Sequence, residues 1–189
     1  MVASHPFHYA RILVAGLLSL VLAGCGFQLR GAPPVPPGLQ PLAVSCVKEI
    51  PDDLCQAVKE QLELGKIDVR EPDQADYILR LRGFRQDRRA SAITVQAAAA
   101  EYTLRQTVDM DVLTRDDLPL IAETRLNSSE TYRYDETNVL AKQREEEELR
   151  QQLYDRLAQQ IIFRLAPLTD SRVTQLREQA VKDQEQDTR

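Results

Sequence analysis

The middle of the chain alternates apolar and polar residues with a period of two, and this pattern limits the possible folds more than any other feature. From position 102, the even-numbered positions include the apolar residues Tyr102, Leu104, Val108, Met110 and Val112. The odd-numbered positions between them are polar, namely Thr103, Arg105, Thr107, Asp109 and Asp111. Because successive side chains of a β-strand point to opposite faces, this segment predicts a strand with one face on a core and one face in water.

Neighbouring segments repeat the alternation. In 77–84, Leu79 and Leu81 share a face, and the pattern returns in 118–126 after a turn at Asp116 and Asp117. Together these segments predict a half-buried antiparallel meander. Residues 42–47 indicate a further, buried strand, and 66–70 a short one. The alanines at 97–100 either continue a strand or flank a flexible hairpin.

The most regular helical pattern lies near the C-terminus, in 136–165. Its apolar stripe, with a residue at every fourth position, consists of Leu149, Leu153, Leu157, Ile161 and Leu165. Asp135 is placed to be the N-cap, and Pro167 ends the helix. The acidic run 145–148 is interpreted as a solvated face near the positive end of the helix dipole.

A shorter helix is predicted from Pro51 to the stop signal at Gly65. Its apolar stripe is Leu54, Val58 and Leu62. Cys46, at the end of the first strand, and Cys55, in the first turn of this helix, are nine residues apart. They form either a disulfide, worth about 2 to 3 kcal/mol for such a short loop, or two buried free thiols.

These elements predict an α+β fold, a two-layer sandwich in which two helices pack on one face of a four-stranded sheet. The sheet is expected to be antiparallel, and mixed at one edge. The folded domain is expected to span 42–168. Residues 169–189 are polar and charged, and we expect a frayed helix or a disordered tail there.

The N-terminus has the form of a bacterial export signal, spanning 1–24. Its apolar run, 12–22, is shorter than the about 20 residues that a membrane-spanning helix needs. The following Leu22-Ala23-Gly24-Cys25 resembles the lipobox of bacterial lipoproteins. The resemblance implies cleavage before Cys25, which then carries a diacylglyceryl group and an N-acyl chain. Gly26, in place of Asp, implies sorting to the outer membrane, on its periplasmic side.

Cleavage changes what chemistry the chain can perform. The signal takes both histidines and Arg11 with it, so the formal net charge falls from −5 to −6. Without imidazole, histidine-dependent triads and histidine metal sites are excluded, and the acidic balance opposes nonspecific binding of nucleic acid. We therefore expect no enzymatic activity, no metal and no cofactor besides the lipid. Residues 25–41 are rich in proline and are expected to form a stiff spacer.

The exposed charges allow two interpretations. The basic residues of interest are Arg80, Arg82, Arg85, Arg88, Arg89 and Lys142. Arginine forks pair well with phosphates, but the same residues also keep strand edges soluble. Asp109 and Asp111 are expected on the wet face of their strand, where carboxylates are ordinary rather than catalytic.

The start of the mature chain, Cys-Gly-Phe-Gln-Leu-Arg-Gly at 25–31, resembles that of the LptE (RlpB) family of lipopolysaccharide-assembly lipoproteins. Two further stretches resemble this family. They are Ala-Glu-Tyr at 100–102, and the helix from Leu-Ala-Lys at 140–142 to Leu-Tyr-Asp-Arg at 153–156. With the order of the elements, the resemblance covers about 25–168.

The resemblance implies a function. Members of this family plug the LptD outer-membrane β-barrel, help to assemble it and bind lipopolysaccharide during its delivery. Binding in the family uses basic residues near the strand hairpin and the following helix, which implies Lys142 here. The matching hairpin position falls near Thr94, which is not basic, so Arg88 and Arg89 are proposed as substitutes. The alternative function is a generic periplasm-facing lipoprotein that scaffolds envelope proteins.

Overall fold

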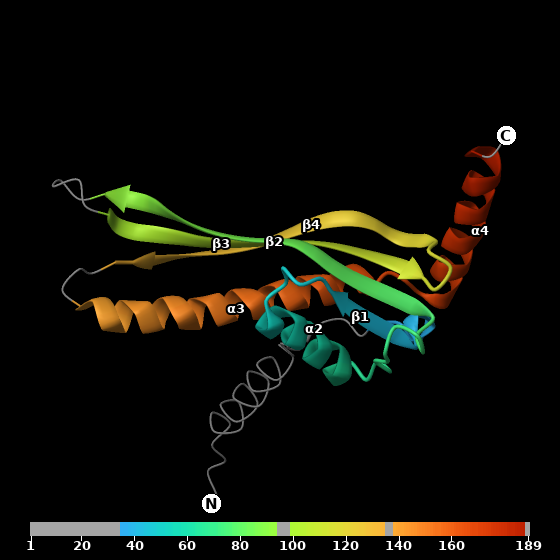
Figure 1. Cartoon of the computed structure of the whole chain (residues 1–189), viewed down its shortest axis with the longest axis horizontal. Coiled ribbons are helices and arrows are strands. Elements are labelled where there is room, and N and C mark those ends of the chain that lie inside the picture. The colour runs from blue at the N-terminus through green and yellow to red at the C-terminus, as the bar shows by residue number, and fades with distance from the viewer. Residues whose placement is uncertain (1–34, 94–98, 135–137, 188–189) are drawn as a thin grey trace, which may run out of the picture. The chain divides into compact units, whose positions relative to one another are not determined.

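The alternating segments form the long strands of one sheet. The computed structural model describes residues 35–93, 99–134 and 138–187. In it, β2 (Tyr77–Ile93), β3 (Ala99–Thr114) and β4 (Pro119–Arg133) are consecutive antiparallel strands (Figure 1). The shorter β1 (Leu42–Cys46) pairs parallel to β2, which makes the order β1-β2-β3-β4. The predicted four-stranded sheet with one mixed edge is confirmed.

Helices α2 (Asp52–Leu64) and α3 (Val139–Leu165) lie on the same side of this sheet (Figure 1). The predicted stripes are buried except for Leu149, which is partly buried. The fully buried residues are Leu54, Val58, Leu62, Leu153, Leu157, Ile161 and Leu165. The two-layer α+β sandwich is therefore confirmed. Helix α3 begins at Val139, later than the expected 136, and the proposed N-cap Asp135 lies outside the described residues.

The C-terminal segment is a helix, where a frayed helix or a disordered tail was expected. Helix α4 (Asp170–Asp187) starts beside η1 (Pro37–Leu39), a single 3-10 turn. A Cβ at Gly38 would collide with the Asp170 carboxylate, so glycine permits this close approach. Val173 is buried and Leu176 packs against the core. The sequence did not predict a stable helix here because it offers only these two apolar residues in a polar stretch. Most of the stability of a helix comes from tertiary packing, which the sequence pattern does not show.

The short strand expected at 66–70 is reduced to one bridge, between Leu42 and Val69. Lys66 has a φ of 59°, in the left-handed region, which an extended strand does not contain. Ile67 nevertheless reaches the core and is 5% exposed.

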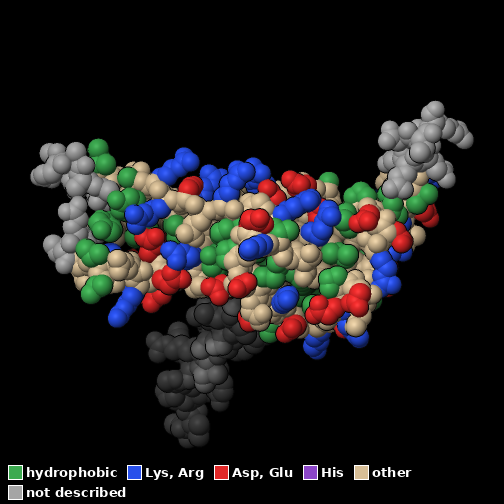
Figure 2. All heavy atoms as spheres, in the orientation of Figure 1, with side chains coloured by type: hydrophobic (Ala, Val, Ile, Leu, Met, Phe, Trp, Pro, Cys, Tyr) green, Lys and Arg blue, Asp and Glu red, His purple; other side chains and the backbone are tan. Residues whose placement is uncertain are grey.

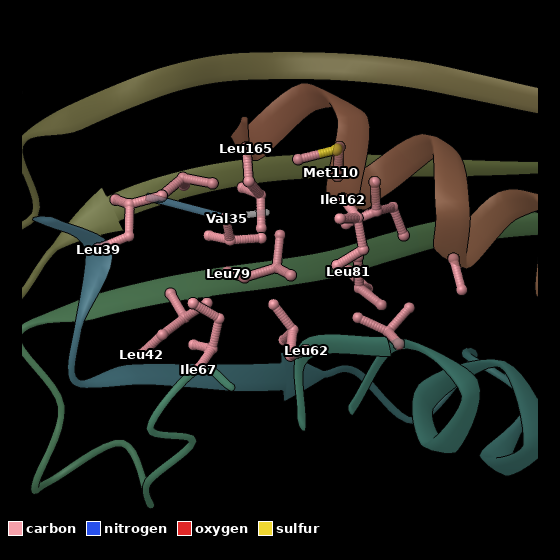
Figure 3. Packing of buried hydrophobic residues seen from close by; sticks show 14 of the residues in the cluster. Val35, Leu39, Leu42, Leu62, Ile67, Leu79, Leu81, Met110, Ile162 and Leu165 are labelled. Carbon is pink, nitrogen blue, oxygen red and sulfur yellow. The ribbon is translucent and has the colours of Figure 1, made fainter. Parts of the chain in front are cut away.

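The apolar interior is divided into a large cluster and a small one. The large cluster, which we call the main core, joins η1 and all four strands to the helices. Figure 3 shows part of it, with Leu39, Leu42, Leu62, Leu79, Leu81 and Leu165 among the labelled residues. The small cluster consists of Leu104, Tyr132 and Leu153, with Tyr102 and Leu149 packed against it.

The two clusters define two ends of the sandwich. The end that contains α2 and the main core is called the core end, and there a Cys46–Cys55 disulfide joins β1 to α2. The other end contains the last residues of β2, the first of β3 and the start of α3, and is called the hairpin end. None of the helices within the described ranges has the length and apolar composition needed to cross a membrane.

Candidate functional site

A β-bulge in β2 decides which way its later side chains point. The register between β2 and β3 shifts between Arg82 and Arg85, and Gly83 there has a φ of 63°. A Cβ on this residue would also collide with the Asp109 carboxylate. Glycine is thus required both by the backbone conformation and by the neighbouring side chain.

Beyond the bulge, Arg88 and Arg89 lie on opposite faces of the sheet. Arg88 is paired with Leu104, which is buried beneath α3. Arg89 is paired with Thr103 on the other face, and its side chain is 83% exposed, 3.6 Å from Asp87. The two arginines that the sequence suggested as a common site therefore do not act from the same surface.

Arg88 belongs to a polar cluster built around Glu146 of α3. Its Nη1 donates to Glu146 Oε2 at 2.9 Å, and its guanidinium lies 4.6 Å from the centre of the Tyr102 ring. The Tyr132 hydroxyl donates to the same carboxylate oxygen at 2.5 Å, and Arg150 Nη2 lies 3.8 Å from Oε1. These five residues, called the Glu146 cluster, connect β2, β3 and β4 to α3.

Burial and hydrogen bonding oppose each other at Glu146. Its side chain is 19% exposed, so the run 145–148 is not the uniformly solvated face expected from the sequence. Burial acts to raise its pKa, but the hydrogen bonds from Tyr132 and Arg88 outweigh burial and lower the pKa. Burial and the adjacent carboxylate raise the pKa of Tyr132 to about 12. The cluster therefore holds an ionised carboxylate and a neutral phenol at neutral pH.

Lys142 lies one helical turn before Glu146, on the same side of α3. Its Nζ is 2.6 Å from Glu145 Oε2, and its side chain is 21% exposed. Lys142 and Arg88 are therefore both at the interface of the helix with the sheet, whereas Arg89 is not. Exposed apolar residues occur at the same end, namely Ile93, Val139 and Leu140.

The opposite face of the sheet corrects a second expectation. Asp109 and Asp111 were expected in water, but they are only 6% and 4% exposed. Arg80 donates to Asp111 from Nε at 2.9 Å and from Nη2 at 2.7 Å, and Arg82 also bonds to this carboxylate. Arg125 donates to Asp109 at 2.7 and 2.9 Å, and this pairing lowers the pKa of Asp109. The prediction was wrong because arginines of the adjacent strands lie over both carboxylates.

A buried amide separates the two apolar clusters. Gln106 occupies an even-numbered position of β3, on the face that is otherwise apolar, and it is fully buried. Its Nε2 donates to Gln86 Oε1 at 3.0 Å and to the backbone oxygen of Arg150 at 3.3 Å. The sequence signal for this contact was a polar residue among the apolar positions of the alternating pattern.

The remaining predicted sites are partly beyond what the structure describes. Cys25, the signal at 1–24 and the first part of the spacer, 25–34, lie outside the described residues. In the part of the chain that is described, no three His, Cys, Asp or Glu side chains are grouped so as to hold a metal ion.

Fold and contacts together define a two-layer α+β protein whose polar chemistry lies in arginine–carboxylate and arginine–tyrosine contacts. A family model described as LptE, lipopolysaccharide-assembly, matches residues 39–165. The chain therefore belongs to the LptE family of lipopolysaccharide-assembly lipoproteins, in agreement with the resemblance at its N-terminus. Membership places the protein in lipopolysaccharide assembly, in the cell envelope.

Individual relatives agree with this assignment. The LPS-assembly lipoprotein LptE of Yersinia enterocolitica is 35% identical over 162 residues, which are 84% of this chain and 76% of the relative. That of Photorhabdus laumondii is 28% identical over 178 residues, covering 94% and 96%.

Solved structures share the fold. The crystal structure of the rare lipoprotein B from Shewanella oneidensis matches with a TM-score of 0.57 at 26% identity, covering 67% of this chain and 93% of that one. The solution structure of lipoprotein B from Nitrosomonas europaea matches with a TM-score of 0.59 at 16% identity, over 75% and 90%. The second likeness concerns the fold alone.

Proposed function

We propose that this chain is a non-enzymatic outer-membrane lipoprotein, anchored through Cys25, that plugs and helps to assemble the LptD β-barrel. In the same proposal it binds lipopolysaccharide during transport and insertion at the cell surface. The observation that carries the proposal is the LptE family match over 39–165, which includes all four strands and α3.

The hairpin end is the proposed lipopolysaccharide site. Lipopolysaccharide carries both phosphates and acyl chains, so its site requires cations beside apolar surface. Arg88 and Lys142 supply the cations, with side chains 45% and 21% exposed. The apolar surface comes from Ile93, Val139 and Leu140, which are 69%, 42% and 76% exposed. Arg89, on the opposite face, is a secondary candidate.

Both cations already hold carboxylates, so a phosphate would bind by exchange. Arg88 would either break its ion pair with Glu146 or bind Glu146 and the phosphate together. Lys142 would break its ion pair with Glu145. A phosphate offers these cations the same charge-assisted hydrogen bonds as the carboxylates that it would replace, and Glu146 would keep the hydrogen bond from Tyr132. The Tyr102 ring would keep the Arg88 guanidinium in place while its carboxylate partner changes.

The test is binding of purified lipopolysaccharide to wild type and to Lys142→Asp, together with copurification of the barrel from gentle detergent. We expect the substitution to weaken lipopolysaccharide binding and to leave recovery of the barrel unchanged. Lys182→Asp, on exposed α4, is the matched control because it makes the same change of charge elsewhere.

The outcomes separate the parts of the proposal. Equal binding by wild type and Lys142→Asp removes Lys142 from the ligand site. Loss of the barrel together with the ligand assigns Lys142 to the protein interface. Recovery of soluble envelope proteins in place of a barrel favours the scaffold alternative.

The lipid anchor is tested separately, by mass spectrometry of the mature N-terminus. We expect Cys25 to be the first residue and to carry acyl chains, and Cys25→Ala to abolish them. A free, unmodified terminus at another residue would refute the lipoprotein proposal.

A further inference from the structure

The first half of α3 lies against the sheet through charged side chains. Figure 1 shows this half extending along β2, β3 and β4 beyond α2. Of the described residues from Val139 to Gln152, none is buried, and burial in α3 begins at Leu153. The partly buried residues form the stripe that faces the sheet, and most of them are charged. They are Lys142, Glu145, Glu146, Leu149 and Arg150.

The sheet beneath this stripe is apolar and aromatic. Leu104 and Tyr132 are 1% and 5% exposed, and the centres of the Tyr102 and Tyr132 rings are 6.1 Å apart. Charged side chains offer such a surface little apolar contact, so an apolar ligand would cover it better. We propose that this surface is an acyl-chain site, and that lipopolysaccharide inserts an acyl chain between the first half of α3 and the sheet.

The proposal rests on the function proposed above, because it takes the ligand to be lipopolysaccharide. Arg88 and Lys142, the cations proposed for its phosphates, lie at this same interface. The exposed residues Ile93, Val139 and Leu140 lie at the same end, and Figure 2 shows hydrophobic side chains among charged ones there. A phosphate bound to the cations would therefore bring the acyl chains of the same molecule beside the apolar surface.

Phosphate binding would also remove contacts that hold the helix on the sheet. Arg88 and the Tyr132 hydroxyl both donate to Glu146 Oε2, at 2.9 and 2.5 Å. When a phosphate takes Arg88, only the hydrogen bond from Tyr132 remains of these two. Arg150, one turn later on α3, lies 3.8 Å from Glu146 Oε1 and moves with the helix. The carboxylate can therefore leave the sheet and still have a cation beside it.

The contact between Gln106 and Arg150 marks where the separation would end. The Gln106 amide donates to the backbone oxygen of Arg150 at 3.3 Å, longer than the usual range of about 2.7 to 3.2 Å. Within the described residues, Gln106 Oε1 and Arg150 Nε are buried and have no hydrogen-bond partner. Such atoms destabilise the closed arrangement, because water cannot reach them. Further along, the residues from Leu153 to Leu165 anchor the second half of α3 in the interior.

The acyl chain makes the separation dependent on the complete ligand. Its contacts with Tyr102, Leu104 and Leu149 exist only when the helix has left the sheet, so its binding shifts the equilibrium toward that arrangement. A ligand with phosphates and no acyl chain would exchange ion pairs and leave the helix in place.

The experiment compares intact lipopolysaccharide with its deacylated form, which keeps the sugars and phosphates. Each is added to the full-length, lipidated protein in gentle detergent, and hydrogen exchange is followed in residues 139–150, with α2 as the internal reference. A diazirine-bearing amino acid is then placed at Leu149, which packs against the small cluster. The matched control carries it at Leu64, which is 77% exposed on α2.

We expect intact lipopolysaccharide to accelerate exchange in 139–150 about tenfold, because helix amides that leave a packed interface open more often. The deacylated form should not accelerate it. On irradiation, Leu149 should form an adduct with an acyl chain, and Leu64 should not.

Binding at the surface alone predicts the reverse, since a bound ligand then protects the helix. If intact lipopolysaccharide binds but leaves exchange in 139–150 unchanged or slows it, the inference is overturned and the proposed function stands. Acyl adducts that are as abundant at Leu64 as at Leu149 overturn it in the same way. If the wild type binds neither form, the lipopolysaccharide role in the proposed function is refuted, and this inference with it.

Discussion

The core end and the hairpin end of the sandwich are held together by different forces. At the core end, η1, α2, α3 and α4 pack with all four strands around a main core of 24 buried residues, counted within the described ranges. At the hairpin end, three strands pack against the first half of α3 alone, over a cluster of three buried residues. The Glu146 cluster supplies the remaining contacts there.

The difference has a consequence for function. Apolar burial does not depend on the charge of a ligand, so the core end keeps its structure when a ligand binds. A ligand that carries charge can replace a hydrogen bond or an ion pair with an equivalent one of its own. The end of the molecule proposed to bind lipopolysaccharide is thus also the end whose contacts can be exchanged.

The largest expected effect is at the core end, where Leu157 of α3 is fully buried. Leu157→Ala should lower the free energy of unfolding by about 2 to 5 kcal/mol, because it removes apolar contacts and leaves a cavity. Chemical denaturation measures it. The control is Phe163→Ala, six residues along the same helix and 53% exposed, which should change stability by no more than about 0.5 kcal/mol. Equal effects of the two substitutions would show that the helix presents a different face.

Removal of the disulfide should have the next largest effect, also at the core end. Cys46→Ser/Cys55→Ser opens a loop of sequence separation 9. The unfolded chain gains conformational freedom, so stability should fall by about 2 to 3 kcal/mol. Hydrogen exchange of the α3 start and the end of β2 should be unchanged. Faster exchange there would contradict the independence of the two ends.

At the hairpin end, Tyr132→Phe removes the hydroxyl that donates to Glu146 and keeps the ring that packs on Leu104 and Leu153. The lost hydrogen bond should cost about 0.5 to 1.5 kcal/mol. Hydrogen exchange should accelerate at the start of α3 and in β4, while α2 is unaffected. If α2 accelerates to the same extent, the two ends unfold as one unit and the comparison fails.

The smallest effect concerns pH and tests the charge of Glu146. Its pKa is lowered on folding from the ordinary value of 4.5, so the folded state binds this proton less readily than the unfolded chain. The resulting stability is present above about pH 4.5 and is lost as the pH falls through the folded pKa. Unfolding measured between pH 6 and 3 should therefore depend on pH more steeply in wild type than in Glu146→Gln. Asp109 contributes in the same direction to both proteins, so identical curves would mean that Glu146 does not contribute.

Much of the fold was predictable because it depends on periodicity within single segments. The alternation in 102–112 identified β3, and the stripe from Leu149 to Leu165 identified α3 and its buried face. The motif at Cys25 indicated the family that the match over 39–165 shows. The lipid at Cys25 and the ligand role of Lys142 stay predictions.

The surroundings of the charged residues were decided only by the tertiary structure. The pattern of β3 places Asp109 and Asp111 on the polar face, but the arginines that bury them come from β2 and β4. Likewise, the bulge at Gly83 places Arg88 beside Glu146 and Arg89 on the opposite face of the sheet. Periodicity describes how one segment divides its own side chains between two faces. The register between strands, and the helix packed on them, determine what each side chain then meets.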